Sequence, residues 1–234
     1  MNIAIITARG GSKRIPKKNI RDFCGKPIIA FSISAAIESK LFSEVMVSTD
    51  STEIAEIAVK CGASVPFLRS SENANDFAGT ADVIAEVLSS YERTNKIFKQ
   101  GCCIYPTAPL LSPSVLTAGL ELFEKNNFDV VFPVLKYGYP IQRSLKMGVR
   151  NQVSMIWPEN YSKRSQDLEP VFHDAGQFYW FRSEYILKHK KLFGDNIGGL
   201  LIDEMSAQDI DSESDWLLAE LKYRSLGRNR SKKF

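Results

Sequence analysis

The sequence is poor in the residues that build metal centres and disulfide frameworks. Its 234 residues include two histidines and four cysteines, and no two cysteines are spaced as C-x-x-C. Cys102 and Cys103 are adjacent in an apolar run, where neighbouring side chains point to opposite faces of a strand. We therefore expect four reduced, mostly buried thiols. A chain of this length can bury a core without a disulfide or metal staple.

Long hydrophobic runs are also missing. No apolar stretch approaches the roughly 20 residues that span a bilayer, and the apolar start at residues 2–6 meets Arg9 too soon for a signal peptide. The hydrophobic fraction of 44% and the mean hydropathy of −0.16 are typical of a soluble globular chain. We expect a cytoplasmic protein that has no targeting segment and binds no membrane.

Strand-like and helix-like segments alternate through the first half of the chain, which predicts βαβ units around a parallel sheet. The expected strands are residues 2–7, 44–49, 64–68, 101–105 and 128–134, and the expected helices are 27–39, 51–61, 76–91 and 113–125. Hairpins and a long loop are expected over 137–174, followed by strands at 176–181 and 199–202 and helices at 184–191 and 213–223. The prediction is one α/β domain over residues 1–234, doubly wound, with a mostly parallel sheet and an irregular second-half region.

The most informative segment is the basic loop (residues 8–19), which follows the first expected strand. Gly10 and Gly11 let the backbone approach a ligand, and Arg9, Lys13 and Lys18 can neutralise a polyphosphate. The segment contains neither G-x-x-x-x-G-K-[ST] nor G-x-G-x-x-G, so it is not a common nucleotide motif. A solvated basic loop is the alternative, but ligands of doubly wound folds bind at the carboxyl ends of strands, as here.

Several short motifs resemble those of the CMP-sialic acid synthetase family of sugar-acid cytidylyltransferases. The pattern A-R-x-G-S-K-x-I-P-x-K-N opens the chain, V-S-T-D ends at Asp50, P-T-A-P-L begins at Pro106, and D-I-D begins at Asp209. The resemblance covers nearly the whole chain. Segments such as W-P-E-N-Y, from Trp157, and H-D-A-G-Q-F-Y-W, from His173, resemble the pseudaminic acid branch of that family.

The resemblance implies a Rossmann-like nucleotidyltransferase fold and transfer of CMP from CTP to the anomeric hydroxyl of a nine-carbon 2-keto sugar acid. Pyrophosphate would leave, and the product would serve surface glycan or flagellin glycosylation. Pseudaminic acid is the expected substrate, with legionaminic, N-acetylneuraminic and 3-deoxy-octulosonic acid as alternatives. Tyr105 and His173 depart from the sialic acid pattern, which argues against N-acetylneuraminic acid. A non-catalytic nucleotide- or nucleic acid-binding protein is a distant alternative, and we expect no nucleic acid partner.

The family pattern also assigns roles to individual residues. Arg9, Lys13 and Lys18 correspond to a triphosphate clamp, with Arg9 and Lys18 acting in catalysis. Together with these three, the expected nucleotide-binding residues are Ala8, Gly11, Ser12, Asn19, Arg69, Ala78 and Thr80. For Arg69 a surface salt bridge is the alternative.

Asp209 and Asp211 are the expected Mg²⁺ ligands. On an extended segment, residues i and i+2 project to the same side, and two carboxylates plus substrate phosphates suit Mg²⁺. Asp211 is also the candidate base for the attacking hydroxyl. The alternative is an acidic cluster at a helix N-terminus, where Ser212 or Asp211 would cap the last helix.

The carboxylate of a sugar acid should meet a cation, for which Arg143 and Arg164 are the candidates. The other expected sugar contacts are Tyr105, Gln142, Gln166, Asp167, His173, Asp174 and Gln177. For each one, loop structure or a dimer contact is an alternative. The family forms homodimers, so we expect residues of about 137–180 to contact a partner and the substrate.

The net charge of +3 is unevenly distributed. Residues 9–26 hold seven of the 30 cations and a single acidic residue, Asp22. The tail at 224–234 holds five more cations and no acidic residue. The remainder of the chain is therefore acidic. A concentrated basic loop on an acidic body fits a site for one nucleotide, and we expect the tail to be frayed.

Overall fold

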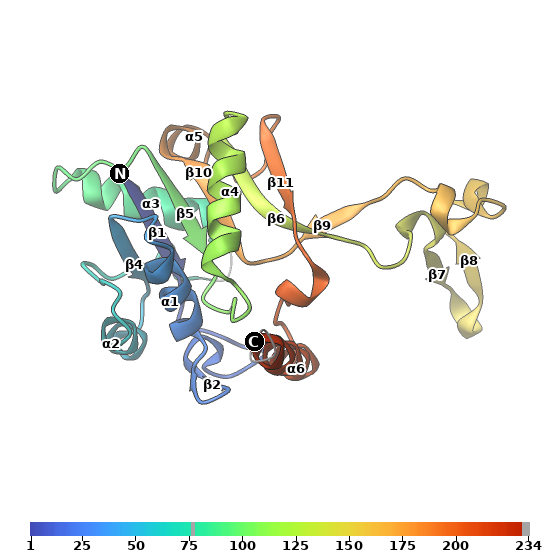
Figure 1. Cartoon of the computed structure of the whole chain (residues 1–234), viewed down its shortest axis with the longest axis horizontal. Coiled ribbons are helices and arrows are strands. Elements are labelled where there is room, and N and C mark those ends of the chain that lie inside the picture. The colour runs from blue at the N-terminus through green and yellow to red at the C-terminus, as the bar shows by residue number, and fades with distance from the viewer. Residues whose placement is uncertain (76–77, 231–234) are drawn as a thin grey trace.

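The structure is a computed structural model that describes residues 1–75 and 78–230. At its centre is a seven-stranded sheet in the order β11-β6-β10-β5-β1-β4, with β9 paired to β6 (Figure 1). The strands of this sheet are β1 Asn2–Thr7, β4 Glu44–Ser48, β5 Gln100–Ile104, β6 Val130–Lys136, β9 Phe172–Asp174, β10 Phe178–Arg182 and β11 Ile197–Leu201. Two small two-stranded sheets complete it: β2 Asp22–Phe23 with β3 Lys26–Pro27, and β7 Leu145–Met147 with β8 Val153–Met155.

The predicted α/β fold is confirmed, with one strand reversed in the middle of the sheet. β1 runs parallel to β4 and β5, and β11 runs parallel to β6, whereas β10 is antiparallel to both β5 and β6. A parallel pair needs a crossover, usually a helix. No crossover joins β6 to β10, because the chain turns back over residues 137–171. β9 and β10 then follow one another along β6, both antiparallel to it.

Helices cover both faces of the sheet, as a doubly wound fold requires. One face packs against α1 (Ile29–Ser39), α2 (Thr52–Lys60) and α4 (Pro113–Lys125), and the other against α3 (Thr80–Glu92) and α5 (Ser183–His189). Cys102 and Cys103 lie in opposite cores, as predicted, and all four cysteines are free. Because both faces of the sheet are buried, its strands read as continuous apolar runs.

The helix ends follow their capping residues. Ser51 and Asp50 are both possible N-caps of α2 from the sequence, and Ser51 takes the role by accepting a hydrogen bond from the backbone N–H of Ile54 at 3.4 Å. The last helix, α6 (Glu213–Arg230), begins at Ser212, whose hydroxyl accepts a hydrogen bond from the Asp215 N–H while the Asp215 carboxylate accepts one from the Ser212 N–H. Of the two expected caps, Ser212 therefore takes the role.

The carboxyl ends of β1, β4 and β5 meet at one edge of the sheet, where the basic loop follows β1. The loop leads into the one-turn helix η1 (Lys18–Ile20) and the β2–β3 hairpin. Trp216 and Ala219 of α6 pack there against Ile15, Phe23 and Ile28 in a separate apolar cluster. The last helix thus supports the basic loop from its outer side (Figure 1).

Between β6 and β9 the chain leaves the body as an arm (residues 137–171), visible on the right of Figure 1. The arm holds the β7–β8 hairpin and short 3₁₀ turns rather than large elements. These turns are η2 Ile141–Arg143, η3 Val149–Asn151, η4 Pro158–Asn160 and η5 Ser165–Asp167, and a further turn in the body is η6 Glu204–Ser206. The predicted hairpin and loop in this region are confirmed.

Some predicted boundaries are wrong. Residues 64–68 form no strand, and only Ser64 makes an isolated bridge, to Met46. The last helix continues past Tyr223 to Arg230, so the first part of the basic tail is helical rather than frayed, while Lys232 and Lys233 lie outside the described residues. Asp76, where a helix was expected to begin, also lies outside them. Over the described part of the chain, no helix is long and apolar enough to cross a membrane.

Candidate active site

The basic loop is held in place by its own backbone and by the neighbouring strand. The Ala8 N–H donates to Ser48 O at 3.0 Å, and the Gly10 N–H donates to the Asp50 carboxylate at 2.8 Å. The Asn19 side-chain amide donates to Arg9 O at 2.8 Å, which ties the far end of the loop to its start. These contacts fix the backbone that carries the cations.

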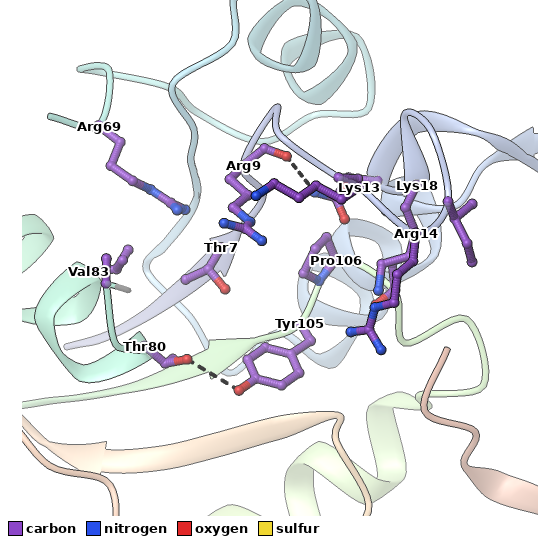
Figure 2. Close-up of a pocket in the computed structure, with 15 residues that line it drawn as sticks. Thr7, Arg9, Lys13, Arg14, Lys18, Arg69, Thr80, Val83, Tyr105 and Pro106 are labelled. Atoms are coloured by element: carbon purple, nitrogen blue, oxygen red, sulfur yellow. Dashed lines mark hydrogen bonds between the residues drawn. The ribbon is translucent and has the colours of Figure 1, made fainter. Parts of the chain in front are cut away.

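The loop borders a cavity of about 430 Å³, which we call the nucleotide cavity after the nucleotide-binding residues expected there (Figure 2). Figure 2 shows Arg69, Arg9 and Lys13 along one side of it, with Thr80 and Tyr105 on the other. Its lining brings together most of the expected nucleotide-binding residues: Arg9, Ser12, Lys13, Lys18, Asn19, Arg69, Ala78 and Thr80. Ala8 is buried beneath the loop, and Gly11 is exposed outside the lining. The cavity is thus formed by the basic loop together with Arg69 and the start of α3.

Arg69 belongs to this cavity rather than to a surface salt bridge. Its guanidinium donates through Nε to Ser48 Oγ at 3.0 Å and through Nη2 to Ser48 O at 2.6 Å. Burial lowers the pKa of Arg69, with the Asp50 carboxylate opposing that effect. An arginine remains charged despite such a shift, so Arg69 is a fixed cation facing the hollow.

Tyr105 ends the cavity at the carboxyl end of β5. Its hydroxyl lies 3.3 Å from Thr80 Oγ1, and its ring packs edge-on against Tyr179 with 5.5 Å between ring centroids. The Tyr179 hydroxyl donates to Asp174 at 2.5 Å, and the other Asp174 oxygen accepts from the Gly176 N–H at 2.8 Å. Burial raises the pKa of both tyrosines, so both hydroxyls remain protonated.

A second cavity of about 460 Å³, the acidic cavity, lies beside the first and contains both expected metal ligands. Asp209 and Asp211 line it together with His173, Asp174 and Asp215. Arg14 Nη2 lies 2.7 Å from Asp211 Oδ1, and Lys18 Nζ lies 3.6 Å from the same atom. Since Arg14 and Lys18 also line the nucleotide cavity, Asp211 stands at the boundary between the two.

Asp209 and Asp211 are the residues of this cavity that could hold a divalent cation. Burial raises the pKa of Asp209, and the nearby Asp211 carboxylate raises it further because two like charges disfavour each other's ionisation. A cation between them would relieve this repulsion. No cluster of three or more His, Cys, Asp or Glu that could hold a metal occurs within residues 1–75 and 78–230, so the remaining ligands would have to be phosphate oxygens and water.

The expected sugar contacts fall into two groups. Tyr105 lines the nucleotide cavity, and His173 and Asp174 line the acidic cavity. Gln177 is 1% exposed and lines neither, since its amide donates to Ser206 O at 2.7 Å.

Five other expected contacts lie on the arm and line neither cavity of this chain: Gln142, Arg143, Arg164, Gln166 and Asp167. Two of them pair with each other, since Arg164 Nε donates to Asp167 Oδ2 at 2.8 Å. Gln142 Nε2 donates to Glu169 O within the arm, and Arg143 contacts Ser165. A single chain therefore does not bring these residues to either cavity, and their contact with substrate stays a prediction.

Sequence reasoning missed three residues at the site. Arg14 holds Asp211, Tyr179 holds Asp174, and Lys222 of α6 lines the acidic cavity. Arg14 could have been found, because it lies inside the basic loop. Lys222 is harder to recognise from the sequence. It lies three residues after Ala219 and six after Trp216, at a spacing that places it near the buried face of α6, where a lysine is unusual.

Comparison with known proteins agrees with this geometry. The cytidylyltransferase family profile matches residues 3–197. A pseudaminic acid cytidylyltransferase of Campylobacter jejuni is 40% identical over 95% of this chain and 96% of its own length. A CMP-N,N'-diacetyllegionaminic acid synthase of Legionella pneumophila is 33% identical over 93% of this chain and 94% of its own.

Among solved structures, a CMP:2-keto-3-deoxy-manno-octonic acid synthetase complexed with CTP superposes with a TM-score of 0.71. It covers 97% of this chain and 100% of its own at 16% identity, which establishes a shared fold. The family resemblance expected from the motifs is confirmed, and the chain belongs to the cytidylyltransferase family.

Proposed function

We propose that this protein transfers CMP from CTP to the anomeric hydroxyl of a nine-carbon 2-keto sugar acid, with pseudaminic acid as the preferred substrate. The observation that carries the proposal is the junction of the two cavities. Cations of the basic loop line one side of it, and the Asp209–Asp211 pair lines the other. Relatives named for pseudaminic and legionaminic acid support a nonulosonic acid as acceptor.

Phosphoryl transfer depends on positioning and charge neutralisation more than on covalent chemistry. In this proposal Arg9, Lys13 and Lys18 bind the triphosphate, with backbone and hydroxyl donors of Ser12 beside them. Arg69 and Thr80, at the far end of the cavity, contact the ribose and cytosine. This arrangement points the α-phosphate toward the acidic cavity.

The sugar acid would occupy the acidic cavity, near His173 and Asp174, with Tyr105 at the boundary. Asp209 and Asp211 would hold Mg²⁺, which supplies charge neutralisation at the phosphates when bound. The attacking hydroxyl passes its proton to the Asp211 carboxylate, which Arg14 and Lys18 keep in place. The hydroxyl oxygen bonds to the α-phosphorus as pyrophosphate departs.

The substrate is tested with CTP and a panel of sugar acids. Pseudaminic, legionaminic, N-acetylneuraminic and 3-deoxy-octulosonic acid are each incubated with CTP and Mg²⁺, and the CMP-sugar is identified by mass. We expect pseudaminic acid to give the highest kcat/KM. No CMP-sugar with any member of the panel would refute the proposal.

We further propose a homodimer in which the arm of each chain completes the acidic cavity of its partner. Apolar side chains on the arm are exposed in the single chain, with Met147 at 72% and Val149 at 82%. Arg143 and Arg164 lie on the same arm, and a guanidinium group can bind the substrate carboxylate through two parallel hydrogen bonds.

Mixing two inactive variants tests this arrangement. R143A/R164A keeps an intact body, and D211N keeps an intact arm. If each arm reaches the cavity of the partner, a mixed dimer contains one complete site, formed by the body of R143A/R164A and the arm of D211N. The mixture then recovers activity that neither variant has alone. If the mixture remains inactive although mixed dimers form, the arm does not complete the site of its partner.

We also propose that the protein acts in the cytoplasm. Its four cysteines are free, which is compatible with a reducing compartment.

A further inference from the structure

Lys222 is a lysine of α6 that is buried rather than solvated, with 8% of its surface exposed. Its ammonium group donates to two backbone carbonyls, Glu204 O and Ala207 O, each at 2.9 Å. Burying a charged group is unfavourable unless hydrogen bonds replace its hydration. These two bonds therefore account for its place in the interior, and both go to the same short stretch of chain.

That stretch is the acidic segment (residues 204–211), which joins β11 to α6 and carries Asp209 and Asp211. Apart from the one-turn η6, it has no regular structure that would satisfy its carbonyls. Two side chains from other parts of the chain also donate hydrogen bonds to its carbonyls. Gln177 Nε2 donates to Ser206 O at 2.7 Å, and Lys18 Nζ donates to Ile210 O at 2.6 Å.

Four carbonyls of the acidic segment thus accept hydrogen bonds from side chains far away in the sequence. Ala207 is completely buried, so its carbonyl has no ready replacement for the Lys222 donor. The segment also packs against the turn before β10, because a Cβ on Gly176 would lie 3.4 Å from Asp209 Cγ. A shift of the backbone at 204–207 would therefore move Asp209 relative to its neighbours.

We propose that Lys222 is a positioning residue that fixes the acidic segment so that Asp209 and Asp211 present their carboxylates together to a divalent cation. Gln177, just before β10, assists by donating a hydrogen bond to Ser206 O. This inference rests on the proposed function, in which the acidic pair holds the metal.

The test compares K222M with K96M. Lys96 forms an ion pair with Glu44 at 2.5 Å at the opposite edge of the sheet, so K96M also removes a partly buried lysine but leaves the acidic segment intact. Binding of Mn²⁺ is followed by electron paramagnetic resonance with CTP present and the sugar acid absent, because phosphate oxygens supply part of the ligand set. Hydrogen exchange of residues 203–211 is measured by mass spectrometry. D209N serves as the reference for loss of the metal site.

We expect K222M to bind Mn²⁺ at least about ten-fold more weakly than the wild type, as removal of residues that orient metal ligands does. Exchange in residues 203–211 should accelerate about ten-fold in K222M and stay unchanged in K96M. The Mg²⁺ concentration for half-maximal activity should rise by a similar factor. If K222M does not fold, K222Q, which keeps one amide donor group, and Q177L are measured in its place.

Equal Mn²⁺ affinity of wild type and a folded Lys222 variant would overturn the inference and leave the proposed function intact. Faster exchange of the segment with unchanged Mn²⁺ affinity would also overturn it, since the ordering would then serve stability alone. A wild type that binds no Mn²⁺ would remove the metal site from the proposed function, and this inference with it. K96M and K222M losing Mn²⁺ affinity equally would count against a local role.

Discussion

Lys18 provides the sharpest test of the junction between the two cavities. Its ammonium lies 2.6 Å from Ile210 O and 3.6 Å from Asp211 Oδ1, and it also lines the nucleotide cavity. Replacing it with methionine keeps the length and apolar stem of the side chain. The variant K18M therefore removes the charge and the donors while leaving most of the packing.

The expected loss can be worked from these contacts. Removing one donor aimed at developing charge costs about 10²- to 10³-fold in rate, or about 2.7–4 kcal/mol. The unpaired Ile210 carbonyl costs about 1–3 kcal/mol of folding stability. The attraction to Asp211 adds little, because the Asp211 side chain is 45% exposed and water screens it. We expect kcat/KM for CTP to fall at least about 100-fold.

The neighbouring lysine offers a matched control. Lys17 Nζ pairs with Glu53 of α2 at 2.7 Å, both side chains are more than half exposed, and Lys17 lines neither cavity. K17M should lose about 0–1 kcal/mol of stability and keep kcat/KM within about two-fold. Both are measured by pyrophosphate release and by urea unfolding. If K18M retains kcat/KM within five-fold of the wild type, or K17M falls as far as K18M, the assignment of Lys18 is wrong.

Three further predictions concern stability and are read by chemical unfolding. S51A removes the N-cap of α2 and should cost about 0.5–2 kcal/mol at neutral pH. Y179F removes the hydroxyl that donates to Asp174 and should cost about 1.5–3 kcal/mol, the range for a hydrogen bond to a charged acceptor; no change would mean that the contact is solvated. Burial acts to raise the pKa of Glu44, but hydrogen bonds, first from Lys96, outweigh it and hold the pKa below its usual value. A lowered folded pKa contributes stability above the unfolded value and loses it as pH falls through the folded value, so acidification should weaken the wild type more than E44Q.

The alternation of strands and helices could be predicted from the sequence because both faces of the sheet are buried, which gives short apolar runs between amphipathic helices. Helix ends were readable where a capping residue is present, as at Ser51. Residues 64–68 were misread because their apolar residues resemble a strand, although only Ser64 reaches β4. The reversed direction of β10 depends on the route of the chain through the arm, which no local pattern encodes.

The nucleotide side of the site could be predicted because most of it lies in one continuous loop. Arg9, Lys13 and Lys18 all lie in the short basic loop after β1, and folding had only to add Arg69 and Thr80. The sugar side could not be predicted in the same way. The acidic cavity combines β9, the acidic segment and α6, and the arm residues expected there lie elsewhere in the single chain.

The fold class, the position of the basic loop at a strand end and the closeness of Asp209 to Asp211 could all be predicted from the sequence, because each depends on residues close together in the chain. The ion pairs of Arg14 and Lys18 with Asp211, and the hydrogen bonds of the buried Lys222 to the segment that carries both aspartates, follow only from folding. These contacts join residues far apart in sequence. Their partners are backbone carbonyls and carboxylates that become neighbours only after the sheet and α6 have packed.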